Sequence, residues 1–473
     1  MFDLQRMKIV GTKLFSSFLF LLVLAVCLIF SLERSRSDDK RNLGEESPNK
    51  TQQIKLKNIQ NYGYYFSVKL GQPQSKNHFT MMVDTTSSVS WIPDWACQTC
   101  LYSNKRTNFY NCTKNNSTCF QDKSKDYELI FPQGSVNGYL GSELVAFDGL
   151  PINKSINSSI VFANKISQDF YNIQADGILG LGLKENSMQS DIVEGLYRES
   201  LIHSKTFSIY LTNNYLGIDY DSRIIFGGYD PGLMQEEFQF SNIVKGGGSN
   251  LWSVEMENIK IGNVSLLSSP KIEAVLSTFF PDIGVPLGEV DKILAILNQQ
   301  PGIHCRKDSR RANPVCRGGV DGITKFPNIT FQGKELNLEL PGEAYATYIT
   351  SAEYNNIEIE DGYHIILGFR EFGNTTSQFS GKIILGADFQ RYFYTFYDGE
   401  QQRIGFARAK GSDIHWFKSA QWASHMVVGV IGFILVSLIV IVVLYCKRLQ
   451  RINQQNSPEF YKSREYYTQM INL

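Results

Sequence analysis

From Ile54 to about residue 410 the chain is a succession of short segments in which apolar and polar residues alternate, with turn residues between them. Residues 63–70, 138–147 and 251–262 are examples. Alternation with a period of two residues is typical of strands that bury one face, and closely spaced strands favour an all-β domain. Helical spacing occurs only briefly, at residues 190–201 and 289–298. The sequence therefore predicts an all-β domain.

Two stretches of this domain share a frame, which indicates an internal repeat. An apolar run reaches Met-Val-Asp-Thr-Thr at residues 82–86, and another reaches Val-Leu-Ser-Thr-Phe at residues 275–279. Each half later carries an apolar element with glycine, at residues 175–182 and 382–388. Repeated elements with a shallow break at residues 246–249 predict two similar lobes. The predicted lobes are residues 54–245 and 246–412.

These stretches together resemble the pepsin-like aspartic proteases. Taken alone, Asp84 is typical of a turn residue that bonds its own backbone. Asp84 to Pro93 (DTTSSVSWIP), however, is similar to the first active-site motif of that family. Residues 175–182 resemble its apolar-glycine element, and residues 382–406 resemble its C-terminal run. The resemblance covers about residues 60–410 and implies a bilobal fold with a central cleft for a peptide or protein.

The second active-site motif departs from the family at the decisive position. Two aspartates share one proton in such sites, so that one activates water while the other polarises the scissile carbonyl. In this chain Ser277 takes the place of the second aspartate, and a hydroxyl cannot cycle as a carboxylic acid. The resemblance thus implies Asp84 as the surviving catalytic residue and impaired catalysis. Asp282 and Asp291 follow Ser277 too far along the chain to substitute for the missing acid.

Further positions of the two motifs and of the flap either match the family or differ from it. Thr85 and Thr278 are kept, and in the family they bond across the lobes. Thr86 and Phe279 replace glycines, so that Phe279 is expected to strain its loop or to intrude on the cleft. The hairpin at residues 129–138 resembles the family's flap. Its expected tyrosine is Phe131, which lacks the hydroxyl that would bond a partner such as Trp91.

Three functions remain open from these residues. The first is a catalytically impaired pepsin-like ectodomain whose cleft binds a peptide or protein. The second is an active aspartic endopeptidase that uses Asp84. The third is a structural or receptor-like surface glycoprotein that does not use the cleft.

Two hydrophobic segments flank the domain. Leu14 to Ser31 follows Arg6, Lys8 and Lys13, as in a secretory signal peptide or signal anchor over residues 1–32. A polar lead follows over residues 33–53.

The second segment, Met426 to Tyr445, has 20 residues and no charge, and it predicts a transmembrane helix. Basic residues at 447, 448 and 451 place the tail, residues 446–473, in the cytoplasm. A single-pass type I protein of the secretory pathway or cell-surface membrane is expected. Nine Asn-x-Ser/Thr sequons lie between the two segments, at Asn49, Asn111, Asn115, Asn116, Asn153, Asn157, Asn263, Asn328 and Asn374.

Six cysteines between the hydrophobic segments predict disulfides, because an oxidising compartment and an even count favour them. Cys305 and Cys316 are expected to pair with each other. Cys97, Cys100, Cys112 and Cys119 allow three connectivities, and zinc at Cys97-x-x-Cys100 is the alternative.

The charge balance bears on partners and cofactors. Lys and Arg number 46, as do Asp and Glu, so the chain has no basic excess for nucleic acid. The sequence has no recognisable metal, nucleotide or flavin motif, and no cofactor is expected.

Overall fold

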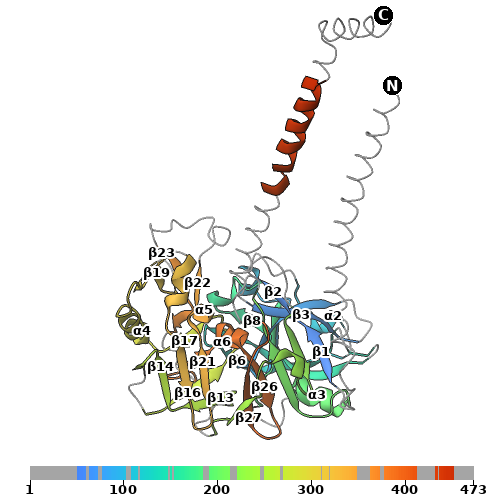
Figure 1. Ribbon diagram of the computed structural model, residues 1–473. Coiled ribbons are helices and arrows are strands. Elements are labelled where there is room, and N and C mark those ends of the chain that lie inside the picture. The colour runs from blue at the N-terminus through green and yellow to red at the C-terminus, as the bar shows by residue number, and fades with distance from the viewer. Residues whose placement is uncertain are drawn as a thin grey trace, which may run out of the picture. The chain divides into compact units, whose positions relative to one another are not determined.

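The computed structural model describes residues 51–59, 63–72, 77–102, 108–115, 118–147, 150–151, 154–184, 191–213, 221–245, 250–266, 270–309, 312–318, 320–348, 363–372, 378–412, 432–434 and 436–451. Strands dominate this part of the chain, and the predicted all-β class is confirmed (Figure 1). The N-terminal hydrophobic segment, the polar lead up to residue 50 and the predicted tail beyond residue 451 lie outside the described residues.

An eight-stranded sheet belongs entirely to the first half of the chain. Its strands, in spatial order, are β2 (Lys57–Ile59), β3 (Gly63–Leu70), β4 (His78–Asp84), β9 (Gly177–Gly180), β5 (Ser90–Pro93), β8 (Ile156–Ile166), β7 (Ser135–Phe147) and β6 (Phe120–Ile130).

Three sheets belong to the second half. The five-stranded sheet contains β13 (Ser253–Met256), β16 (Ile272–Leu276), β25 (Ile383–Leu385), β17 (Ile283–Val285) and β24 (Phe369–Glu371). One four-stranded sheet contains β15 (Val264–Ser265), β14 (Asn258–Ile261), β20 (Ile329–Gln332) and β21 (Asn337–Leu340). The other contains β18 (His304–Arg306), β19 (Val315–Arg317), β23 (Tyr363–Leu367) and β22 (Ala346–Tyr348).

A six-stranded sheet draws on both halves of the chain (Figure 1). Its strands, in spatial order, are β1 (Gln52–Lys55), β11 (Arg223–Phe226), β10 (Thr206–Tyr210), β26 (Phe393–Asp398), β27 (Arg403–Arg408) and β12 (Gln239–Asn242). Strands β26 and β27 therefore pair with strands from the first half, although they lie near the end of the domain in sequence.

Helices are short. The α-helices of the domain are α2 (Cys112–Asn115), α3 (Ile192–Arg198), α4 (Glu289–Leu297), α5 (Gly342–Tyr345) and α6 (Ala387–Tyr392). The 3₁₀ turns are η1 (Thr99–Tyr102), η2 (Gln168–Phe170), η3 (Pro231–Leu233) and η4 (Val320–Lys325). Both stretches with helical spacing in the sequence contain a helix, α3 and α4.

The repeat seen in the sequence corresponds to a repeated strand arrangement. In the first half, β4 runs parallel to β9 and pairs Asp84 with Gly180, while β5 runs antiparallel to β9. In the second half, β16 runs parallel to β25 and pairs Leu276 with Leu385, while β17 runs antiparallel to β25. Each apolar-glycine element thus lies between the two strands that flank an active-site motif.

Burial explains the composition of these central strands. Every residue of β9 and of β25 is buried, so neither strand alternates apolar and polar residues. Gly180 is needed because a Cβ atom there would lie 2.6 Å from the carbonyl oxygen of Ser87. Gly386, at the matching place, would bring a Cβ atom to 2.0 Å from the carbonyl oxygen of Asp282. The glycines let each motif loop approach its central strand.

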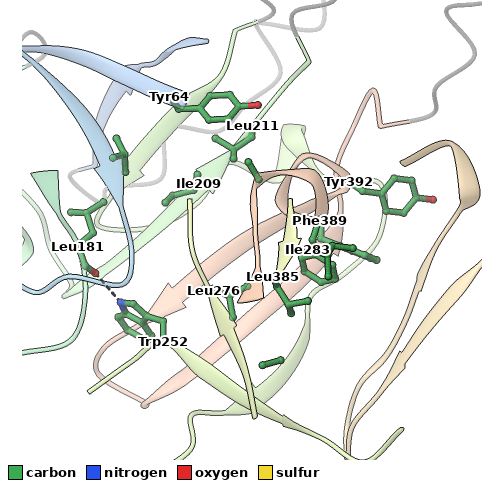
Figure 2. Packing of buried hydrophobic residues seen from close by; sticks show 14 of the residues in the cluster. Tyr64, Leu181, Ile209, Leu211, Trp252, Leu276, Ile283, Leu385, Phe389 and Tyr392 are labelled. Atoms are coloured by element: carbon green, nitrogen blue, oxygen red, sulfur yellow. Dashed lines mark hydrogen bonds between the residues drawn. The ribbon is translucent and has the colours of Figure 1, made fainter. Parts of the chain in front are cut away.

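The core beneath the motif strands connects the two halves. Leu276, Leu385 and Ile283 pack in one cluster with residues of the first half (Figure 2). The indole nitrogen of Trp252 donates a hydrogen bond of 2.8 Å to the carbonyl oxygen of Leu181, as the dashed line in Figure 2 shows.

Within the described residues there are three disulfides, Cys97–Cys100, Cys112–Cys119 and Cys305–Cys316. The predicted pairing of Cys305 with Cys316 is confirmed. The open connectivity of the first four cysteines resolves into two local pairs, and the disulfide at Cys97 and Cys100 excludes these two residues as zinc ligands.

The last helix in the described part of the chain, Gly432–Arg451, is long and apolar enough to cross a membrane (red in Figure 1). The predicted span at residues 426–445 overlaps this helix from residue 432 onward, and residues 426–431 lie outside the described residues.

Candidate active site

The site is built around Asp84, the last residue of β4, whose side chain is fully buried. The Thr86 hydroxyl donates to Asp84 Oδ1 and Oδ2 at 2.9 and 2.7 Å, and the Ser87 amide donates to Oδ2 at 2.9 Å. Burial raises the pKa of Asp84 from 3.8 to about 6, although the hydrogen bonds from Thr86, Ser87 and Ser277 act in the opposite direction. The carboxyl group is therefore poised to change its charge in mildly acidic solution.

Thr86 is a site residue whose role the sequence did not reveal. The motif comparison marks it only as a replacement for glycine. In the structure its hydroxyl is the nearest donor to the Asp84 carboxylate.

Ser277 lies opposite Asp84, directly after β16. Its hydroxyl oxygen is 3.5 Å from Asp84 Oδ1, which is a long hydrogen bond. The same oxygen accepts a hydrogen bond of 3.1 Å from the Phe280 amide. The structure thus brings Asp84 and Ser277 together across 193 residues of sequence.

The two motif threonines connect the loops from which these residues project. The Thr85 hydroxyl donates to the carbonyl oxygen of Leu276 at 2.7 Å, and the Thr278 hydroxyl donates to that of Val83 at 2.8 Å. The Thr278 amide also donates to the Thr85 hydroxyl oxygen at 3.3 Å. All of these groups are buried, so the bonds fix the relative positions of Asp84 and Ser277.

Phe279 lies inside an aromatic cluster that belongs otherwise to the first lobe. Its ring stacks on Phe170 with centroids 5.6 Å apart, and meets Phe131 edge-on at 5.8 Å. Only 5% of Phe279 is exposed. The Phe279 ring therefore packs among side chains of the first half, and its expected intrusion on the cleft stays a prediction. Strain is not found, because among the described residues the non-glycine positions with positive φ are Ser200, Asp221 and Gln402.

The flap is the hairpin of β6 and β7, whose turn is closed by the Phe131 amide bonding the Gly134 carbonyl oxygen at 2.8 Å. The Gln133 side chain donates to the Phe279 carbonyl oxygen at 3.3 Å. From the second half, Gln378 donates to the Ile130 carbonyl oxygen at 3.5 Å. Two glutamine amides therefore hold the flap against the second lobe.

Phe131 and Trp91, both fully buried, meet through a shared neighbour. Phe170 contacts Phe131 at 5.3 Å and Trp91 at 5.8 Å between ring centroids. Phe170 and the two glutamines were not identified from the sequence, since no motif marks them. Tyr65 belongs to the same buried cluster, and burial raises the pKa of its hydroxyl, which has no hydrogen-bond partner within the described residues.

The acids near the second motif are held elsewhere. Asp282 pairs with Arg370, whose Nη2 lies 2.7 Å from Asp282 Oδ2, and its Oδ1 accepts from the Asn313 amide at 2.9 Å. Asp291 forms an ion pair with Lys307 at 2.8 Å. The arrangement thus offers one carboxyl group and one hydroxyl, and both oxygens of Asp282, the next acid in sequence after Ser277, are engaged. No group of residues suited to hold a metal ion occurs among the described positions.

Comparison with known proteins agrees with this geometry. The family model described as eukaryotic aspartyl protease matches residues 63–409. Renin of Ovis aries is 24% identical over 76% of this chain and 84% of its own length. Pepsin A of Gallus gallus is 24% identical over 74% of this chain and 86% of its own length. Cathepsin D of Rattus norvegicus is 26% identical over 75% of this chain and 82% of its own length.

Proposed function

This chain belongs to the eukaryotic aspartyl protease family, and from that premise we propose that it is a membrane-anchored member that binds a peptide or protein without hydrolysing it. The observation that carries the proposal is the pair formed by Asp84 and Ser277. A hydroxyl oxygen lies 3.5 Å from the Asp84 carboxylate, where the family chemistry needs a second carboxyl group.

Without a second carboxyl group, the site lacks one of the two proton-transfer groups that peptide hydrolysis requires. Attack on a peptide requires a base that takes a proton from water and an acid that protonates or polarises the scissile carbonyl. Asp84 can serve as either, but not as both at once. The Ser277 hydroxyl donates a hydrogen bond, but it does not ionise in the pH range of the reaction.

Phe279 adds a steric barrier to the chemical one. Its ring packs against Phe131 of the flap, and the Gln133 side chain of the flap donates a hydrogen bond to the Phe279 carbonyl oxygen, so that flap and second motif are held together. A peptide chain that entered between the flap and the second motif would need to displace the Phe279 ring from Phe131. We therefore infer that the partner binds without close approach of a peptide bond to the carboxyl group.

Membrane attachment is the second part of the proposal. The helix Gly432–Arg451 supports a single span, and the basic residues at its end orient the tail toward the cytoplasm. Three disulfides support an oxidising environment for the domain. The domain would thus face the lumen or the cell exterior.

Two other functions retain a specific observation in their favour. The pKa of about 6 at Asp84 favours residual endopeptidase activity, because the carboxyl group can exchange a proton in mild acid. The buried Phe279 ring favours a structural or receptor-like surface protein that does not use the cleft.

Cleavage of a peptide library by the full-length protein in detergent, from pH 3 to pH 7, tests the proposal. We expect no cleavage above that of an Asp84→Ala variant prepared in parallel. Cleavage that pepstatin blocks and that Asp84→Ala abolishes would establish the endopeptidase instead. A peptide bound without being cut would separate the binding function from the structural one.

A further inference from the structure

The turn between β14 and β15 presents one sequon asparagine to solvent. Ile261 pairs with Val264, so Gly262 and Asn263 form the two-residue connection of this hairpin. Gly262 has φ of +57°, the left-handed conformation that such tight connections favour. Asn263, Val264 and Ser265 are exposed, and together they form the Asn-x-Ser sequon.

Three other sequon asparagines have described side chains, and two of these are less suited to carry an oligosaccharide. Asn111 is half-buried, and its Oδ1 accepts hydrogen bonds from the amide and the hydroxyl of Thr113 at 3.1 and 2.8 Å. Asn157 is exposed, but it lies within β8, where its backbone pairs with Leu144 of β7 instead of forming a turn.

Asn328 is exposed, but its side-chain amide is already engaged. Its Nδ2 donates to Glu339 Oε1 at 2.5 Å, and this nitrogen is the atom that glycosylation would modify. The side chain of Asn263, by contrast, makes no hydrogen bond with the described part of the chain. Asn263 and Asn328 are also close in the fold. The amide of Gly262, the residue before Asn263, donates to the Asn328 carbonyl oxygen at 2.8 Å. Two oligosaccharides at such neighbouring positions would compete for the same space.

We propose that Asn263, rather than Asn328, carries an N-linked oligosaccharide on this hairpin. The Asn263 Nδ2 attacks the anomeric carbon of an oligosaccharide held on a polyisoprenyl pyrophosphate. A carbon–nitrogen bond forms as the bond from carbon to the phosphate oxygen breaks. The lipid pyrophosphate leaves with that electron pair, and the proton that the amide nitrogen loses passes to water. The inference rests on the luminal placement in the proposed function, and not on the loss of hydrolysis.

The position gives the modification a physical role. Strand β15 is the edge of its four-stranded sheet, and Val264 within it is 41% exposed. An edge strand with an exposed apolar side chain can pair with another chain. A hydrated oligosaccharide on the preceding residue covers this edge and prevents such pairing.

Expression of the full-length chain in a eukaryotic secretory host tests the assignment. Intact mass and electrophoretic mobility are measured before and after treatment with peptide-N-glycosidase, and the tryptic peptide that contains Asn263 is sequenced by mass spectrometry. We expect Asn263→Gln and Ser265→Ala each to lose one oligosaccharide. Ser265→Thr keeps the sequon and should keep the oligosaccharide. Asn328→Gln is the matched control and should lose none.

An unmodified Asn263 in a chain that carries oligosaccharides elsewhere would overturn the assignment and leave the luminal placement intact. Loss of one oligosaccharide in Asn328→Gln would overturn the preference for Asn263. A chain without any oligosaccharide would overturn both the assignment and the luminal placement. The peptide-cleavage assay does not depend on these results. If the protein did hydrolyse peptides, that assay would show it whether or not Asn263 is glycosylated.

Discussion

Thr85 and Thr278 each donate a side-chain hydrogen bond to the strand that carries the other, at 2.7 Å to Leu276 and 2.8 Å to Val83. The exchange holds the two motif loops together, and it does so with Ser277 rather than an aspartate in the second loop. The threonine hydrogen bonds do not require a second carboxyl group. The positions of the two loops are therefore kept whether or not the site can catalyse hydrolysis.

Removal of either hydroxyl should lower stability. Thr85→Val leaves the Leu276 carbonyl oxygen buried without this donor, and we expect the free energy of unfolding to fall by about 1–3 kcal/mol. Urea unfolding of the full-length protein in detergent measures the loss, with Thr85→Ser as the control that keeps the hydroxyl. The double variant with Thr278→Val should lose less than the sum of the single variants, because the two bonds support each other. Strict additivity would contradict this coupling.

The raised pKa of Asp84 predicts a pH-dependent stability. The folded state binds the Asp84 proton more tightly than the unfolded chain does, since the pKa rises from 3.8 to about 6. Its contribution to stability is therefore fully present below about pH 4 and is lost as the pH rises through 6, by about 3 kcal/mol in all. The stability of Asp84→Asn relative to the wild type should thus increase between pH 4 and pH 7. A difference that does not vary with pH in that interval would rule out the raised pKa.

Truncation of Phe279 should leave a cavity between the lobes. Phe279→Ala loses the contacts with Phe131 and Phe170, and we expect the free energy of unfolding to fall by about 3–5 kcal/mol. Phe279→Leu fills more of the space and should lose less. Hydrogen exchange at flap residues 131–134 should also become faster in Phe279→Ala. Unchanged stability and exchange would show that the ring does not support the closed flap.

Restoration of the second carboxyl group should produce hydrolysis only together with removal of the Phe279 ring. We expect the double variant Ser277→Asp with Phe279→Gly to cleave peptides in acid, and pepstatin to block the cleavage. Each single variant should remain inactive, because Ser277→Asp keeps the ring that packs against the flap and Phe279→Gly lacks the second acid. Activity in Ser277→Asp alone would mean that Phe279 does not obstruct a peptide.

The sequence predicted much of the scaffold because its signals are local. The alternation of β7 and β14 and the uninterrupted apolar runs of β9 and β25 depend on which faces each strand buries. The short pair Cys305 and Cys316 could be predicted for the same reason, since few residues separate the two cysteines. The two local pairs of the first cysteine group could not, because several pairings satisfy the same spacing.

The contacts between the flap and the second lobe could not be predicted from the sequence, because they join segments that are far apart along the chain. Gln133 bonds the Phe279 carbonyl oxygen across 146 residues, and Gln378 bonds the Ile130 carbonyl oxygen across 248. Neither glutamine belongs to a motif, and Phe170 resembles any other core residue until its ring is found stacked on Phe279.

By itself the sequence determined the all-β class, the repeated frame and the presence of Ser277 rather than an aspartate in the second motif, because each depends on residue identity and local order. Only the tertiary structure decided how Asp84 is buried, where the Phe279 ring lies and what holds the flap closed. Burial and packing depend on which surfaces meet after the chain has folded, and the first lobe's aromatic cluster meets Phe279 only when the two halves come together.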